Sequence, residues 1–158
     1  MIACALALGL TASLVACQPT ASNAVELGRS AAGLEQVPLT IHSGAKTHRF
    51  TVEVARTAEE QRVGLMNRQQ LAPDRGMLFP FAEQRVASFW MRNTLIPLDM
   101  IFIRADGTIT NIEANTVPLS EEPVMSYEPV TAVLEIPGGR SAELGIKAGD
   151  TVKWSAPR

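Results

Sequence analysis

Five side chains able to bind a ligand lie inside the apolar stretch SFWMRNTLIPLDM, residues 88–100. They are Trp90, Arg92, Asn93, Thr94 and Asp99. Together they supply an aromatic ring, a guanidinium, an amide, a hydroxyl and a carboxylate, groups of the kind that orient small molecules in pockets. The stretch is therefore a candidate binding site for a small polar molecule, a glycan or a protein partner.

Two interpretations of Trp90 are open. Alternation along a strand places Phe89 and Met91 on one face and Trp90 and Arg92 on the other. If the first face is core, Trp90 stands at a rim, where an aromatic ring stacks on a ligand or holds a cation. Alternatively, the helix or the loop of residues 66–76 covers Trp90, because large aromatic side chains are usually buried at least in part.

The polar residues that follow Trp90 also have two interpretations. Asn93 and Thr94 fall where a strand ends, and Asp99 comes just after Pro97, so all three suit turns and caps as well as a site. A site needs further partners from elsewhere in the chain. The available ones are Glu135, Arg62 and Arg68.

Asp99 and Glu135 suggest an alternative from another class, a carboxylate-dependent hydrolase of the cell envelope. Such an enzyme uses one protonated and one ionised carboxyl group across the bond that it breaks. A buried carboxylate paired with Arg62 or Arg68 explains the same residues without catalysis. The chain contains no Gly-x-Ser-x-Gly, no His-Glu-x-x-His and no phosphate loop. A binding or a purely structural role is therefore favoured over an enzyme.

Methionines and histidines suggest a third chemistry, the binding of Cu(I) by thioethers. The residues concerned are His42, His48, Met66, Met77, Met91, Met100 and Met125. Methionine is also a common core filler, and no short loop combines two His with a Met. The sequence therefore predicts neither a metal nor another cofactor.

The N-terminus predicts export. Residues 1–16 carry no charge, and their apolar run is typical of a secretory signal but too short to span a membrane. The run ends in LVAC, residues 14–17, which resembles the bacterial lipobox and implies cleavage before Cys17 and lipidation of its thiol. Gln18 then favours the outer membrane. We expect a lipoprotein on the periplasmic side of that membrane, or a soluble periplasmic protein if Cys17 is not lipidated.

Composition is consistent with one folded domain. After a small, polar segment at residues 17–36, which reads as a tether, about 120 residues from 37 to 158 are enough to bury a core. The chain is 46% hydrophobic and 19% charged, as in ordinary globular proteins. Its net charge of -2 opposes nucleic-acid binding as the main activity.

Periodicity predicts a mainly β (α+β) domain, a small β-barrel of about seven short strands and one short helix near residues 58–67. Thr57 and Glu60 form a capping-box pattern at the start of that helix. Asp106 and Gly107 form the clearest hairpin turn, and Ser141 is a candidate cap for a later helical turn. Expected extended segments are residues 38–44, 48–55, 77–81, 85–91, 98–104, 108–113, 129–136 and 150–154.

The order of several long motifs resembles the bacterial and archaeal family called domain of unknown function 192. The motifs are RVGLMNRQQLAPDRGMLFPF, FWMRNTLIPLDMIFI, DGTI and VLEIPGG. The resemblance covers residues 38–156 and implies a small β-barrel-like fold, often exported. It implies no activity, so function depends on the residues themselves.

Overall fold

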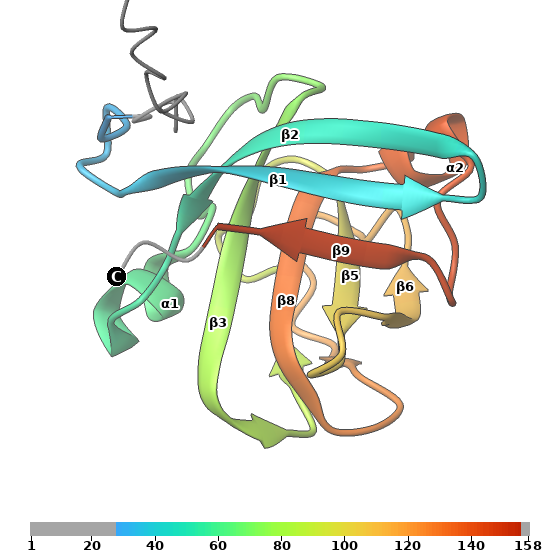
Figure 1. Cartoon of the computed structure of the whole chain (residues 1–158). Helices are drawn as coiled ribbons and strands as arrows, with labels where there is room; N and C mark the ends of the chain where they lie inside the picture. Colours follow the sequence, from blue (N-terminus) through green and yellow to red (C-terminus); the bar gives the residue numbers. More distant parts are fainter. Residues whose placement is uncertain (1–27, 156–158) are drawn as a thin grey trace, which may run out of the picture.

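A computed structural model describes residues 28–155 (Figure 1), so the predicted signal segment and Cys17 lie outside the described residues. This part of the chain forms nine strands and two short helices, α1 (Ala58–Val63) and α2 (Arg140–Leu144). Within it, no helix is both long and apolar enough to cross a membrane. The strands are β1 (Gln36–Ser43), β2 (Lys46–Val54), β3 (Arg75–Arg85), β4 (Ser88–Phe89), β5 (Leu98–Ile103), β6 (Ile109–Glu113), β7 (Val124–Met125), β8 (Val130–Pro137) and β9 (Thr151–Trp154).

Seven strands form one curled sheet in the order β6-β5-β8-β3-β2-β1-β9. Figure 1 shows β1, β2 and β9 crossing steeply over β3, β8 and β5. Only β2 and β3 pair in parallel among these neighbours. A bridge between Thr108 and Thr151 links the two ends of the sheet. The domain is therefore mainly β and barrel-like, as predicted.

Both faces of the central strands are covered by apolar side chains. The face inside the curl packs around residues such as Val52, Ile101 and Leu134. The outer face packs around Met77 and Met100 with other apolar residues of a second core. All six residues of β5 are buried, so apolar side chains lie on both faces of the strand and are interrupted only by Asp99, whereas a half-buried strand alternates.

Several local predictions are confirmed. The first hairpin pairs β1 with β2, and Gly107 lies in the turn between β5 and β6 with a φ of 84°. The capping box of α1 is complete: Thr57 Oγ1 accepts from the backbone N–H of Glu60, whose carboxylate accepts from the backbone N–H of Thr57. These features depend on neighbouring residues, which explains why the sequence reveals them.

Other predicted boundaries are wrong. β3 does not end at Pro80 but continues to Arg85: Pro80 still pairs with Ala132 of β8, and the register shifts only between Pro80 and Arg85. The pairing with β2 ends at Leu78, so proline interrupts no ladder on that side. The helix α1 stops at Val63 because the chain turns at Gly64, whose φ is 49°. The folded part also begins before Val37, since Leu34 is buried in the outer core.

Two further corrections concern short elements. The expected strand over residues 85–91 is reduced to β4, which pairs with β7 in a separate two-stranded ribbon. Ser141 does not cap α2 but lies within it, and its hydroxyl has no partner among the described residues. The carboxylate of Asp99 takes that role.

Candidate functional site

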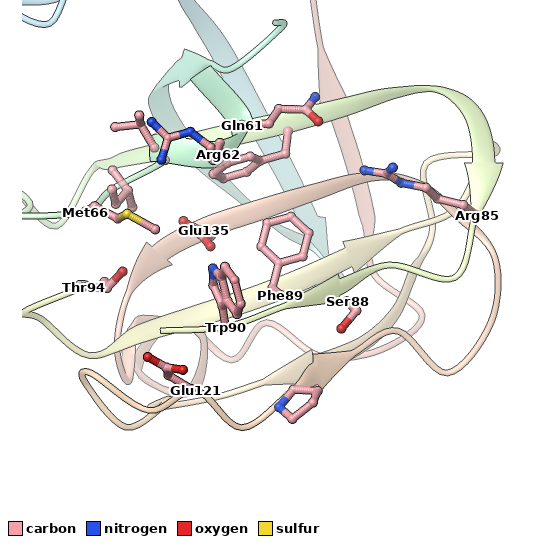
Figure 2. Close-up of a pocket in the computed structure, with 15 residues that line it drawn as sticks. Gln61, Arg62, Met66, Arg85, Ser88, Phe89, Trp90, Thr94, Glu121 and Glu135 are labelled. Carbon is pink, nitrogen blue, oxygen red and sulfur yellow. The ribbon is translucent and has the colours of Figure 1, made fainter. Parts of the chain in front are cut away.

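A cavity of about 410 Å³ opens on the outer face of the sheet, beside α1 and β4 (Figure 2). We call it the α1–β4 pocket. Its volume lies within the range of roughly 300–1,000 Å³ that is typical of small-molecule sites. The lining residues are Gln61, Arg62, Val63, Gly64, Leu65, Met66, Phe79, Arg85, Ser88, Phe89, Trp90, Thr94, Glu121, Pro123 and Glu135.

Helix α1 is fixed over one side of the pocket by a few polar contacts. The side-chain amide of Gln61 donates to the backbone carbonyls of Ala55 and Pro80, at 3.1 and 2.9 Å. At the end of the helix, Gly64 lies against the ring of Phe79, where an added Cβ would be 3.3 Å away. The turn at Gly64 therefore brings Leu65 and Met66 to the pocket wall.

Aromatic rings form much of the rest of the wall. Phe79 from β3 and Phe89 from β4 make an edge-to-face pair with centroids 5.2 Å apart. Trp90 follows Phe89, just after the end of β4, and lines the same pocket, whereas the next residue, Met91, is buried. Trp90 is 48% exposed, so it is neither core nor fully covered by the loop of residues 66–76.

Glu135 contributes a nearly buried carboxyl group. It stands on β8 between Met77 of β3 and Met100 of β5, which are its direct cross-strand neighbours on the outer face. The residue is 5% exposed and lines the pocket, and Figure 2 shows its carboxyl group between Met66, Trp90 and Phe89. Within residues 28–155, its side chain makes no hydrogen bond or ion pair with protein.

The surroundings of Glu135 change its acidity. Burial among apolar side chains disfavours the charged carboxylate and raises the pKa of Glu135 to about 8. The carboxyl group is therefore protonated and neutral near pH 7. Gly76 of β3 allows the close approach of β8 here, because an added Cβ would lie 2.5 Å from the backbone oxygen of Glu135.

Charged groups at the pocket mouth are already engaged. Arg62 forms two hydrogen bonds to the carboxylate of Glu59, at 2.8 and 2.6 Å. The guanidinium of Arg85 lies over the ring of Phe81, with 4.0 Å to its centroid. Neither arginine forms an ion pair with Glu135.

Asp99, a predicted rim residue, does not line the pocket. Its two carboxylate oxygens accept hydrogen bonds of 2.7 to 2.8 Å from the backbone N–H groups of Asn115, Gly139 and Ser141. The residue pairs with Ile136 and is fully buried, so it faces the inner core while Glu135 faces outward. The hydrolase alternative requires the two carboxyl groups to face each other across a cleft, and they do not.

The other predicted site residues are divided. Thr94 lines the pocket, with its hydroxyl 3.4 Å from the carbonyl of Arg92. The guanidinium of Arg92 lies over the Trp90 ring, 5.6 Å from its centroid, and 3.7 Å from the carboxylate of Glu121. Asn93 has a φ of 55°, and its carbonyl accepts from the N–H of Asn67, as expected for a residue that serves a turn.

Arg68 and the metal candidates lie elsewhere. Arg68 forms a bidentate pair with Glu53 beside a second cavity of about 390 Å³ and does not line the α1–β4 pocket. His42 bonds to Thr47 on the first hairpin, and Met66 alone of the proposed thioether ligands lines the α1–β4 pocket. In the described part of the chain, no group of three or more His, Cys, Asp or Glu residues is placed to hold a metal ion.

Sequence reasoning missed Gln61, Arg85, Phe79 and Glu121 as lining residues. Glu121 belongs to the loop that the pairing of β4 with β7 brings to the pocket. Each of these strands has only two residues, too few for a recognisable alternation in the sequence. Glu135, by contrast, is among the residues named from the sequence, where it is the single acid inside the apolar strand VTAVLEI.

Fold and pocket together define a class of protein, a small β-barrel-like domain with an aromatic, acid-bearing pocket on its outer face. More particularly, the chain belongs to the DUF192 family, described as "Uncharacterized ACR", whose model matches residues 39–154. No curated protein matches the chain.

Two crystal structures are similar over nearly their whole length. A protein of unknown function from Novosphingobium aromaticivorans DSM 12444 is 45% identical, with a TM-score of 0.80, covering 88% of this chain and 99% of that one. A protein of Sinorhizobium meliloti 1021, described as a candidate transcription regulator, is 43% identical, with a TM-score of 0.75, covering 77% of this chain and 95% of that one.

Proposed function

We propose that this protein is an exported, lipid-anchored envelope protein that binds a small organic molecule in the α1–β4 pocket. One observation carries the binding proposal: the carboxyl group of Glu135 is nearly buried, opens to a cavity and has no protein partner in the described chain. The oxygens of Glu135 reach the cavity and are not among the fully buried polar atoms that lack a partner, so a ligand beside Trp90 can complete their hydrogen bonds.

A small molecule suits the pocket better than the other occupants suggested by the sequence. The cavity is walled by three aromatic rings and is of small-molecule size, whereas a protein partner buries a much larger surface, roughly 800 Å² on each side. The S. meliloti relative carries a name that proposes transcription regulation. We do not extend it to this chain, because a net charge of -2 provides no general attraction to nucleic acid.

Trp90→Ala is expected to abolish ligand binding and leave the domain folded, because the side chain is half exposed. The melting temperature should fall by less than about 4 °C, equivalent to about 1 kcal/mol. Binding is measured by thermal shift with five probes: butylammonium, butanol, acetamide, butyrate and glucose. At least one should raise the wild-type melting temperature, by about 6 °C at ten times its Kd.

Trp154→Phe is the matched control, because Trp154 packs against the inner core, away from the pocket. This variant should keep the ligand-induced shift that Trp90→Ala loses. A shift that survives in Trp90→Ala would place binding elsewhere. A large loss of stability in Trp90→Ala without ligand would instead make Trp90 a structural residue.

The lipid anchor is tested separately with Cys17→Ser, which removes the thiol that lipidation requires. We expect most of the protein to move from the membrane fraction to the soluble periplasmic fraction, because loss of several acyl chains removes the anchor. The measurement is immunoblotting of fractions, with Cys4→Ser as the control. An unchanged membrane share for Cys17→Ser would contradict lipidation at this residue.

A further inference from the structure

The α1–β4 pocket surrounds its acid with aromatic rings. Phe79, Phe89 and Trp90 all line the same cavity as Glu135. Ring faces carry partial negative charge, so they attract cations, and the attraction is stronger where water is excluded. Rings and a carboxylate in one cavity therefore provide two favourable contacts for the same positively charged group.

Among the described residues no cation pairs with Glu135, although the guanidinium of Arg92 lies over the Trp90 ring, 5.6 Å from its centroid, without lining the pocket. Arg62 reaches from α1 but bonds to Glu59, and Arg85 reaches from β3 but stacks on Phe81. The loop before β7 contributes another acid to the lining, Glu121, whose carboxylate lies 3.7 Å from the Arg92 guanidinium. An anionic ligand would thus meet Glu121 and, once ionised, Glu135.

The remaining charged groups on the outer face of the sheet lie further away. Met77 lies between Glu53 of β2 and Glu135. Met100 lies in the same way between Glu113 of β6 and Glu135. Glu53 is paired with Arg68, and Glu113 accepts from the amide of Asn111. No histidine lines the pocket, so Glu135 is the group there that titrates near neutral pH.

We propose that the ligand of this pocket carries an ammonium group, which binds the Glu135 carboxylate inside the enclosure formed by Phe79, Phe89 and Trp90. The inference rests on the proposed function, because it names the chemical class of the molecule bound at that site. Binding is coupled to deprotonation: a cation beside a buried acid favours its ionised form, so the proton leaves Glu135 as the ligand enters.

Calorimetric titration of the whole domain with butylammonium tests the proposal, with butanol as the neutral counterpart. An alkylamine resembles the lysine side chain, with a pKa of about 10.4, and stays charged from pH 6 to 9. We expect its affinity to rise about tenfold per pH unit up to pH 8 and then level off. Titration at pH 7 in buffers of different ionisation enthalpy should show about 0.9 proton released per ligand.

Glu135→Gln keeps the size of the side chain and removes the charge. This variant should stay folded by circular dichroism, bind butylammonium at least tenfold more weakly at pH 8, and release no proton. Butanol that binds as tightly as butylammonium, or an affinity for butylammonium that does not change with pH, would overturn the ammonium proposal while the pocket remained a ligand site. Absence of butylammonium binding at every pH would also overturn it.

Discussion

Asp99→Ala should destabilise the protein by about 4 kcal/mol, a large part of the 5–15 kcal/mol that typically holds a domain folded. The carboxylate of Asp99 is fully buried and accepts three backbone N–H groups, from Asn115, Gly139 and Ser141. Hydrogen bonds to a charged group contribute about 1.5–3 kcal/mol each, and alanine leaves three buried donors without an acceptor. Urea unfolding followed by circular dichroism measures the loss.

Asp99→Asn separates the hydrogen bonds from the shape of the side chain. The amide oxygen still accepts from Asn115 and Gly139, but its NH₂ group faces the N–H of Ser141, so we expect a loss of about 2 kcal/mol. Asp74→Ala is the control, because that exposed carboxylate has only a long contact of 3.8 Å to Arg75. If Asp99→Ala were as stable as Asp74→Ala, the structural role of Asp99 would be wrong.

Glu135→Gln should do the opposite and stabilise the protein at neutral pH. Burial raises the pKa of Glu135 from its ordinary value of 4.5 to about 8 in the folded state. In the unfolded chain the group loses its proton near pH 4.5, while the folded protein keeps it until about pH 8. Between these values the unfolded state binds fewer protons, so the free energy of unfolding falls as pH rises.

The size of this effect follows from the two pKa values. The slope is about 1.4 kcal/mol per pH unit, so wild type loses roughly 3 kcal/mol by pH 7 and up to roughly 5 kcal/mol by pH 8. Above pH 8 both states are ionised and the loss stops. Glutamine does not ionise, so the free energy of unfolding of the variant lacks this fall with pH.

Urea unfolding of wild type and Glu135→Gln from pH 5 to 9 measures the difference between their free energies of unfolding. The titration of all other groups is common to both proteins and cancels in this difference. We expect the two to be similar near pH 5 and Glu135→Gln to be more stable at pH 8. Glu122→Gln serves as the control, because Glu122 is exposed and its variant should follow wild type. Parallel stability curves for wild type and Glu135→Gln would show that Glu135 ionises normally.

The fold was predictable where local chemistry determines it. The capping box at Thr57 and the Asp-Gly turn at residues 106–107 depend on residues a few positions apart, and both occur as expected. The extension of β3 through Pro80 was not predictable, because it depends on the pairing of this segment with β8. Periodicity carries no information about such a partner.

The site was predictable in part for the same reason. Trp90 is exposed and Met91 is buried, as the expected alternation has them, although the strand itself ends at Phe89. The role of Asp99 depends on N–H groups 16, 40 and 42 residues away, so nothing beside it in the chain distinguishes a structural acceptor from a ligand contact. The isolation of Glu135 likewise depends on its neighbours in the sheet, Met77 and Met100.

The central claim is that a small molecule binds between Trp90 and Glu135. Its most direct test is the NMR signal of the Trp90 indole N–H, assigned with Trp90→Ala and recorded with each of the five probes used for the thermal shifts. We predict that at least one probe moves the Trp90 signal in a saturable way, while the Trp154 signal, from a ring on the inner core, stays in place. A Trp90 signal unmoved by every probe, or signals of both tryptophans that move together without saturation, would contradict the claim.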